Sequence, residues 1–529
     1  MSTSGDKPGV ALVAGLQHAA AYPHPVTTPI RVAETHISWV LLTGEYAYKI
    51  KKPVRLSFLD YSTLERRRTL CEDEVRLNRR FAPALYLGVS AIGGTPAAPV
   101  VDGDRQPIEY AVRMRQFRRE DELPALLATG GVGPDDLAAL GTAVARFHAG
   151  AAIVTAHSPY GQPDAVHRVT MDNVVELRAL PEAGAWQARL SRLAARLDAL
   201  QATLRPLMLR RREDGWVREC HGDLHCGNVV RCADKLTPFD GIEFDPALRY
   251  IDVANDIAFL TMDLAERGHL GLRRAALQSW AESLGDWQGL RLLPYYEAYR
   301  ALVRAKVDAL RAEQLDEHSA AREAAVADCC RYLDWSQARL EPRRPPLIIT
   351  CGLSGSGKTW LARRLAERRG ALHLRSDVER KRLAGLAADA PSQSPLDAGI
   401  YTREFNDRTY ARLGECAAAV LASGEAVIVD AAFLRRGERR RFLDLAAAVG
   451  SMATIVHCHA PQAVLRERVA ARTAARNDAS EAGLEVLARQ PGYWEPFEAD
   501  EVAHVTAVDT SDPAAVATLL DRLAAPVAA

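Results

Sequence analysis

Residues 347–359 read LIITCGLSGSGKT, so that an apolar run passes directly into the pattern G-x-x-x-x-G-K-[ST]. Glycines at this spacing let successive backbone N–H groups curl around a phosphate chain, and the residues that follow predict a helix whose positive end faces the same phosphates. Lys358 is expected to reach the β- and γ-phosphates, and the Thr359 hydroxyl is expected to ligate Mg²⁺. We therefore predict that ATP and Mg²⁺ bind here. The predicted nucleotide-binding loop is Gly352, Leu353, Ser354, Gly355, Ser356, Gly357, Lys358 and Thr359.

After residue 346 the chain alternates short apolar runs with long helices rich in Ala, Leu and Arg. Such alternation is typical of a parallel sheet flanked by helices, so we predict an α/β domain over residues 346–529. A further strand is expected just before Arg375. The runs that read as strands are 347–351, 425–430, 453–458 and 503–508.

Two acidic residues follow predicted strands of this domain. Asp430 ends an apolar run and is predicted to hold Mg²⁺, although an acid at such a position is also common in α/β turns. Asp377 is predicted to accept the proton of an acceptor hydroxyl; the alternative is a helix N-cap, and both roles are compatible. Arg380 and Arg403 are predicted to bind an anionic or hydroxylated acceptor.

Arginines further along the chain have two interpretations each. Arg472 and Arg476 lie four residues apart on a predicted helix, where they suit either a lid that closes over the triphosphate or a solvated face. A second group follows Asp430 and could bind an anionic acceptor or form an exposed helix face. Its members are Arg435, Arg436, Arg439, Arg440 and Arg441.

On these motifs the second half, roughly residues 346–529, resembles the small P-loop kinases that phosphorylate metabolites, drugs or polynucleotide ends. The resemblance includes the kinase-like ATP-binding domains that are classed with the AAA family. It implies nucleotide binding and does not identify the acceptor.

A second set of motifs lies in the first half, where residues 221–228 read HGDLHCGN. The spacing H-x-D-x-x-x-x-N is that of a kinase catalytic loop, in which Asp223 would orient and deprotonate the acceptor hydroxyl and Asn228 would hold Mg²⁺. H-G-D in place of H-R-D resembles aminoglycoside phosphotransferases and their small-molecule kinase relatives. Asp240 resembles the metal-binding D-F-G position, with Glu243 and Asp245 close enough to compete for that role.

Glu74 falls on the apolar stripe of the helix predicted over residues 63–80, and a carboxylate that faces the core needs a partner. The candidate is Lys49 on the preceding predicted strand. In a kinase such a pair holds the nucleotide phosphates. The alternative is that Lys49 begins a basic surface patch with Lys51 and Lys52.

The order of the predicted elements also resembles a kinase. Two strands in 37–50, a helix and a strand at 107–114 precede a mostly helical region from 133 to 335. The hairpin near residues 35–38 departs from protein kinases because it lacks G-x-G-x-x-G, and no A-P-E motif is visible, which fits a small-molecule acceptor. A charged stretch that ends in Pro-Pro then separates the halves. The predicted domains are 1–335 and 346–529, with a linker at 336–345.

The order of the two halves resembles proteins known as bifunctional aminoglycoside phosphotransferase/ATP-binding proteins. This resemblance implies an α+β protein-kinase-like domain followed by an α/β P-loop kinase domain with a parallel sheet.

Composition excludes several other classes. The 67 basic residues balance the 67 acidic ones, which disfavours a nucleic-acid partner held by bulk charge. No apolar segment approaches the length needed to span a bilayer, so no membrane partner is expected. Nine irregularly spaced cysteines predict free thiols and a cytoplasmic location. The run Arg210–Arg212 is expected to be a solvated loop.

Together these patterns predict a tandem ATP- and Mg²⁺-dependent phosphotransferase that acts on hydroxyl groups of small molecules at two separate nucleotide sites. Two alternatives stay open. The P-loop half could phosphorylate polynucleotide ends, or the protein could be an ATP-gated regulator with only one active kinase half.

Overall fold

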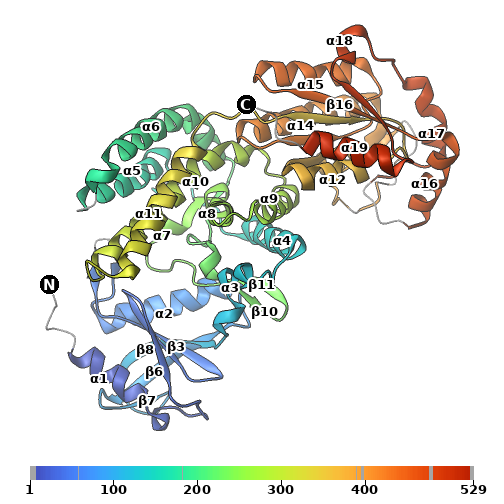
Figure 1. Cartoon of the computed structure of the whole chain (residues 1–529). Helices are drawn as coiled ribbons and strands as arrows, with labels where there is room; N and C mark the ends of the chain where they lie inside the picture. The colour runs from blue at the N-terminus through green and yellow to red at the C-terminus, as the bar shows by residue number, and fades with distance from the viewer. Residues whose placement is uncertain are drawn as a thin grey trace. The chain divides into compact units, whose positions relative to one another are not determined.

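The computed structural model of the chain describes residues 7–56, 59–180, 183–388, 390–392, 394, 398–475 and 480–524. It separates into two compact units, each with its own main sheet (Figure 1). The first unit comprises Met1–Gly268 and Tyr299–Ser336, and the second comprises His269–Ala298 and Gln337–Ala529.

The first unit begins with a sheet of six antiparallel strands. They are β1 (Arg31–Glu34), β2 (Ser38–Leu42), β3 (Tyr46–Lys51), β6 (Tyr86–Thr95), β7 (Ala98–Val101) and β8 (Pro107–Arg115). Their order is β1-β2-β3-β8-β6-β7, so β3 lies inside the sheet, and a short hairpin, β4 (Arg55–Leu56) with β5 (Leu59–Asp60), follows it. Alternation along β3 puts Lys49 and Lys51 on the same face.

Two helices, α1 (Lys7–Leu16) and α2 (Leu64–Asn78), pack against this sheet through separate apolar clusters. α1 contributes Leu12 and Leu16 to one cluster, and α2 contributes Cys71 and Val75 to the other. The N-cap of α2 is Thr63, whose hydroxyl accepts a hydrogen bond from the third helical N–H group. This helix therefore begins where its sequence predicts.

The rest of the first unit is mostly helical, as predicted. Its helices are α3 (Leu123–Ala128), α4 (Pro134–Gly150), α5 (Pro163–Ala179), α6 (Ala183–Glu213), α7 (Pro246–Arg249), α8 (Val253–Glu266), the later part of α10 (Leu293–Glu313) and most of α11 (Ala320–Arg339). Two short antiparallel ladders pair β9 (Val217–Glu219) with β12 (Tyr250–Asp252) and β10 (Val229–Cys232) with β11 (Lys235–Pro238). The candidate catalytic loop connects β9 to β10.

The second unit contains a parallel sheet of five strands in the order β14-β15-β13-β16-β17. These strands are β13 (Leu347–Cys351), β14 (Leu372–Arg375), β15 (Val427–Asp430), β16 (Ala453–His459) and β17 (Val505–Asp509). β13 and β15 are buried along their whole length, which explains why they read as continuous apolar runs. The predicted strands are confirmed, and β14 is the one expected before Arg375.

Helices lie on both faces of this sheet (Figure 1). The helices of the second unit are α9 (Leu270–Leu284), α12 (Lys358–Arg369), α13 (Ser376–Leu383), α14 (Arg403–Ala422), α15 (Arg436–Ala448), α16 (Gln462–Ala475), α17 (Leu484–Arg489), α18 (Ala499–Val502) and α19 (Pro513–Ala524). α12 and α19 share one apolar cluster with the sheet, through Leu361 and Leu365 on α12 and Leu519 on α19. α14 and α15 lie on the opposite face.

The compact units differ from the predicted domain ranges in two places. Residues 269–298, expected in the first domain, belong to the second unit, because their polar and charged side chains bond to residues beyond 336. α11 runs on to Arg339, so the first part of the expected 336–345 linker is helical, with Ser336 and Arg339 buried. The exposed part of the connection is 341–344.

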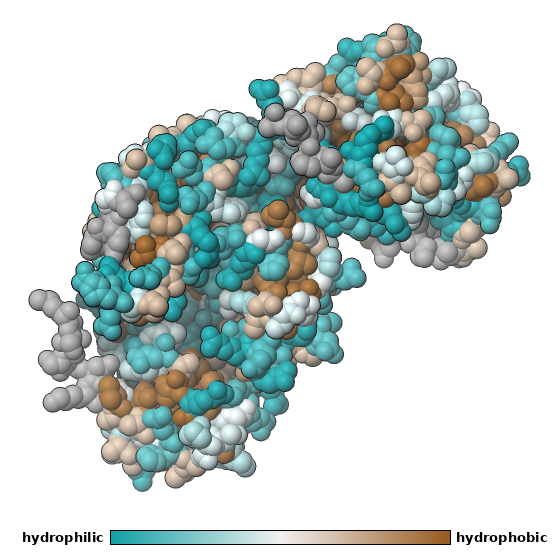
Figure 2. Space-filling model, in the orientation of Figure 1, coloured by the Kyte–Doolittle hydropathy of each residue, from teal (hydrophilic) through white to brown (hydrophobic). Residues whose placement is uncertain are grey.

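The surface is mixed in character. Figure 2 shows hydrophilic residues over most of the face in view, with small, separate hydrophobic patches. Among the described helices, none has both the length and the apolar character needed to cross a bilayer. All nine cysteines are free thiols, as predicted.

Candidate active sites

The loop between β13 and α12 wraps closely against its neighbours. Gly352 and Gly355 adopt φ values of 142° and 82°, a region that favours glycine. A Cβ atom at Gly352 would lie 2.2 Å from the Cys458 carbonyl oxygen, and one at Gly355 would lie 2.6 Å from that of Leu465. The loop therefore requires glycine at both positions. The buried Ser356 hydroxyl has no hydrogen-bond partner among the described residues.

Lys358 and Thr359 follow this loop at the start of α12. Lys358 Nζ donates to the Leu353 carbonyl at 2.8 Å. Burial lowers the pKa of Lys358 below its ordinary value, although Asp430 acts in the opposite direction. Binding of a phosphate would bring a further anionic partner to this half-buried ammonium group.

Asp430 ends β15 and is held at both carboxylate oxygens. Thr350 Oγ1 donates to Oδ1 at 3.2 Å, and His373 Nε2 lies 3.2 Å from Oδ2. Burial opposes ionisation, but bonding with His373 and Thr359 holds the pKa of Asp430 below its ordinary value. The Thr359 hydroxyl and the Asp430 carboxylate are hard oxygen donors in contact, a pair that fits Mg²⁺.

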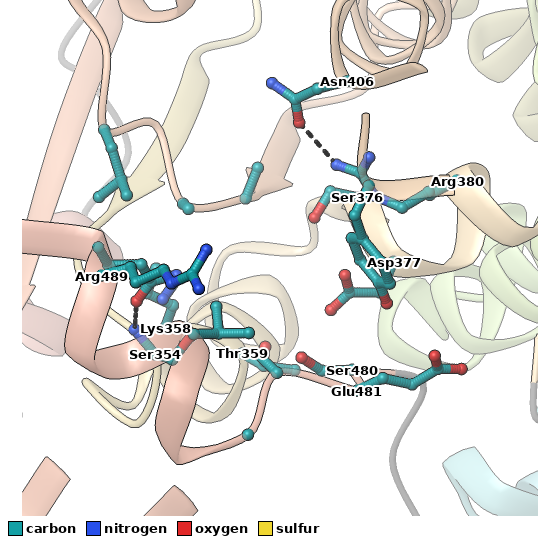
Figure 3. A pocket seen from close by; sticks show the side chains of 18 of the residues that line it. Ser354, Lys358, Thr359, Ser376, Asp377, Arg380, Asn406, Ser480, Glu481 and Arg489 are labelled. Atoms are coloured by element: carbon teal, nitrogen blue, oxygen red, sulfur yellow. Dashed lines mark hydrogen bonds between the residues drawn. The ribbon is translucent and has the colours of Figure 1, made fainter. Parts of the chain in front are cut away.

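A cavity of about 1370 Å³ opens in front of these residues. Figure 3 shows Lys358 and Thr359 on one side and Asp377 and Arg380, both from α13, across the pocket. The structure thus brings the P-loop and the predicted acceptor residues into one cavity. Arg403 and Arg472 also line it, while Arg476 lies outside the described residues.

Asp377 lies in the first turn of α13, where the N-cap position belongs to Arg375. The alternative that Asp377 is the N-cap is therefore wrong. Arg380 is 8% exposed and donates to the Ile400 carbonyl and to Asn406 Oδ1. Its Nε has no partner among the described residues.

The arginines after Asp430 are mostly paired with acids. Arg439 is fully buried and bonds both carboxylate oxygens of Glu501, at 2.6 and 2.9 Å. Arg436 and Arg440 both contact Asp500. Arg435 does line the cavity, so this group offers one cation to the site rather than a basic surface.

The predicted pair of Lys49 and Glu74 is present in the first unit. Lys49 Nζ lies 2.9 Å from Glu74 Oε1 and 2.5 Å from Asp240 Oδ1. Burial opposes protonation of Lys49, but the two carboxylates hold its pKa well above the ordinary value. Lys49 is therefore charged, and its ammonium group contacts Asp240, the candidate metal ligand.

Lys51 is a site residue that sequence reasoning missed. It is 1% exposed, and its Nζ bonds Glu74 Oε2 at 2.6 Å and also Glu243. The hydroxyl of Tyr61 donates to the same Glu243 oxygen. The signal was the two-residue spacing from Lys49, which places both lysines on one face of β3. The surface-patch alternative fails for Lys49 and Lys51, which both pair with the fully buried Glu74, whereas Lys52 pairs with the exposed Glu34.

These contacts separate the three candidate metal ligands. Glu243 is locked against Lys51 and Tyr61, and Asp245 caps α7 by accepting from the Ala247 N–H. The Asp240 side chain is 41% exposed. Asp240 also adopts a left-handed backbone conformation, φ 60°, which is uncommon for a non-glycine residue and frequent at functional sites.

The catalytic loop brings Asp223 and Asn228 together. Asn228 Nδ2 donates to Asp223 Oδ2 at 2.9 Å, and His225 Nε2 lies 3.5 Å from the same oxygen. Although burial opposes ionisation, His225 and His221 hold the pKa of Asp223 below its ordinary value. The carboxylate is therefore ionised at neutral pH, the state that can accept a hydroxyl hydrogen bond.

The loop rests on Asp256 of α8, whose carboxylate accepts the N–H groups of His221 and Gly222. The N-cap of α8 is Asp252, which Arg211 bonds at both carboxylate oxygens, at 2.8 and 2.9 Å. The expectation that Arg210–Arg212 is a solvated loop is wrong. The run lies in α6, and Arg211 is buried because it neutralises this N-cap.

Comparison with known proteins identifies similar chains for each half. Residues 347–497 match the family model described as AAA domain. The chain is 31% identical over 474 residues to the uncharacterized protein Rv2004c of Mycobacterium tuberculosis H37Rv, covering 89% of this chain and 92% of that protein. A gluconokinase structure from Sinorhizobium meliloti is 26% identical and covers 34% of this chain and 97% of its own, with a TM-score of 0.25. A choline/ethanolamine kinase family protein from Mesorhizobium loti is 13% identical, with coverages of 62% and 99% and a TM-score of 0.37.

Replacement of Lys51 tests its part in the first site. Lys51→Met removes one cation from a buried cluster and leaves Glu243 without its ammonium partner, which costs about 3–5 kcal/mol when a buried pair is broken. We expect the free energy of local opening, measured by hydrogen exchange of β3 and α2 amides, to fall by that amount. Lys52→Met is the matched control, because its partner Glu34 is exposed and such pairs contribute about 0–1 kcal/mol. Equal effects of the two substitutions would contradict this assignment.

Proposed function

The chain belongs to the family of the mycobacterial protein Rv2004c, and we propose that it is an ATP- and Mg²⁺-dependent phosphotransferase with two separate nucleotide sites. It joins a protein-kinase-like, aminoglycoside-phosphotransferase-like fold to a P-loop kinase fold. In this proposal each site transfers the γ-phosphoryl group to a hydroxyl of a small molecule. The reaction takes place in the cytoplasm.

The observation that carries the proposal is the cavity that joins the P-loop to Asp377. Its volume, about 1370 Å³, exceeds the roughly 300–1,000 Å³ of ordinary ligand pockets, so there is space for an acceptor beside the triphosphate. A switch that only binds ATP has no need of a carboxylate opposite Lys358. This supports the transferase over the ATP-gated regulator.

In the P-loop site, Lys358 contacts the β- and γ-phosphates, and Thr359 and Asp430 hold Mg²⁺. The ion, when bound, neutralises charge that develops on the phosphates. Asp377 orients the acceptor hydroxyl and takes its proton as the acceptor oxygen bonds to the γ-phosphorus and the bond to the ADP oxygen breaks. Arg380 and Arg403 bind the acceptor, and Arg472 contacts the triphosphate.

The first unit performs the same transfer with different parts. Lys49, positioned by Glu74, contacts the nucleotide phosphates, and Asn228 and Asp240 hold Mg²⁺. Asp223 orients the acceptor hydroxyl and accepts its proton. The ionised state of Asp223 and its 2.9 Å bond to Asn228 support this role.

Polynucleotide end phosphorylation is less well supported. That alternative depended on the arginines after Asp430, and three of them are paired with acids, as described above. A phosphate backbone is bound by unpaired cations, because affinity comes from the counterions that they displace.

The proposal is tested with γ-labelled ATP, Mg²⁺ and a panel of hydroxylated metabolites and RNA. Transfer of label to a metabolite supports it. Label that appears only on RNA ends, or hydrolysis of ATP with no labelled acceptor, would contradict it.

The catalytic loop of the first unit makes a specific prediction. Asp223→Asn, assayed in a Lys358→Ala background so that only the first site turns over, should reduce transfer about 10²–10⁴-fold, the usual contribution of a general base. Nucleotide affinity should be nearly unchanged. Asp245→Asn is the matched control, since asparagine preserves the cap of α7. Full activity in Asp223→Asn would show that the loop is assigned wrongly.

The P-loop site makes a parallel prediction. Asp377→Asn should abolish transfer by the second unit while ATP still binds, because the amide cannot take the proton. Lys358→Ala should impair both ATP binding and transfer. Asp407→Asn, an exposed position on α14, controls for loss of a charge on this unit. Binding is measured by calorimetry and transfer by label. Wild-type turnover in Asp377→Asn would leave the second unit as a nucleotide-binding module only.

A further inference from the structure

A side chain from the segment 269–298 forms hydrogen bonds with the backbone of an edge strand in the second unit. β14 is one of the two edge strands of its sheet, and an edge strand has N–H and C=O groups that need partners. Gln278 of α9 supplies both. Its Nε2 donates to the His373 carbonyl at 2.9 Å, and its Oε1 accepts the His373 N–H at 2.8 Å. The amide group thus pairs with β14 as a neighbouring strand would.

His373, held in this way, also contacts Asp430, the candidate Mg²⁺ ligand. The side chain of His373 lies 3.2 Å from Asp430 Oδ2, and both residues are more than nine-tenths buried. Thr350 occupies the other oxygen of Asp430. The orientation of Asp430 therefore depends on His373, and the backbone of His373 is held by Gln278.

The same segment holds the helix that carries Asp377. Trp287 Nε1 donates to Glu379 Oε1 at 3.0 Å, and Glu379 is 1% exposed. Arg412 donates to the second oxygen of Glu379 at 3.2 Å. Glu379 lies two residues after Asp377 on α13. The segment therefore bonds to His373, which contacts Asp430, and to Glu379, which lies on the same helix as Asp377.

Buried ion pairs join this segment to the later part of the unit. Glu297, which is fully buried, accepts from Arg273 at 2.9 Å and from Arg339 at 2.5 Å. Arg273 also bonds Glu425, two residues before β15, at 2.8 Å. Removal of one member would leave an uncompensated buried charge, which is strongly destabilising. The segment is therefore bonded into the second unit by both charge and hydrogen bonds.

We propose that residues 269–298 are a working part of the P-loop site, in which Gln278 acts through His373 as a positioning residue for Asp430. The inference rests on the proposed function for the role of Asp430 as a metal ligand. Residues 346–529 alone then contain every motif of the site without the support that orients its acid.

The test uses the full chain with Asp240→Asn, which weakens ion binding in the first unit so that the second unit dominates the measured affinity. Mn²⁺ affinity in the presence of ADP is measured by electron paramagnetic resonance of the free ion, and hydrogen exchange reports the His373 amide. Gln278→Leu should speed exchange of that amide and weaken Mn²⁺ binding about 10-fold, at the lower end of the effect of outer-shell partners. Gln288→Leu is the matched control, because Gln288 lies on the same segment but its side chain donates to the Glu415 carbonyl of α14 rather than to β14.

Substitutions at His373 provide a second test that does not depend on whether Gln278→Leu folds. His373→Leu should weaken Mn²⁺ binding about 10–100-fold, and His373→Gln, whose amide nitrogen lies close to the position of His373 Nε2 and can donate to Asp430, should recover most of it. Unchanged Mn²⁺ affinity in both Gln278→Leu and His373→Leu would overturn the proposal, as would an equal loss in Gln288→Leu. If Mn²⁺ affinity falls as expected but no acceptor is ever labelled, the proposed function fails and the positioning role stands.

Discussion

Buried carboxylates and their fixed partners determine where both sites place their reactive groups. An ionised carboxylate is tolerated away from water only when it is hydrogen bonded or paired with a cation. Glu74 lies fully buried between Lys49 and Lys51, and Asp430 lies between Thr350 and His373. Because each partner belongs to a strand of the local sheet, the geometry of the sites follows from sheet packing rather than from flexible loops.

In the first unit this constraint extends from the sheet to the catalytic loop. α8 is buried along almost its whole length, yet it contains Asp256 and Asp263. Asp256 accepts N–H groups at the start of the loop, and Asp263 accepts the Cys226 N–H at 2.9 Å. The two acids, which also pair with His148 and Arg267, accept from the backbone of the loop and fix the segment that carries Asp223. A buried helix with acidic residues thus holds the candidate base in place.

Features that depend on local pattern could be predicted from the sequence, and those that depend on distant partners could not. The P-loop, the parallel sheet and the contact of Lys49 with Glu74 follow from glycine spacing, apolar runs and strand alternation. Lys51 was missed because Lys52, beside it, made the run read as a surface patch. The role of residues 269–298 was hidden because no local pattern marks Arg273, Glu297 and Arg339 as partners before the fold brings them together. The catalytic roles assigned to individual residues remain predictions.

The central proposal, that one chain holds two separate nucleotide sites, is tested most directly by the stoichiometry of binding. A non-hydrolysable ATP analogue is titrated into the full chain with Mg²⁺ and followed by calorimetry. The account predicts two molecules bound per chain, with one lost in Lys358→Ala and the other weakened in Asp240→Asn. A single molecule per chain, lost entirely in Lys358→Ala, would contradict it.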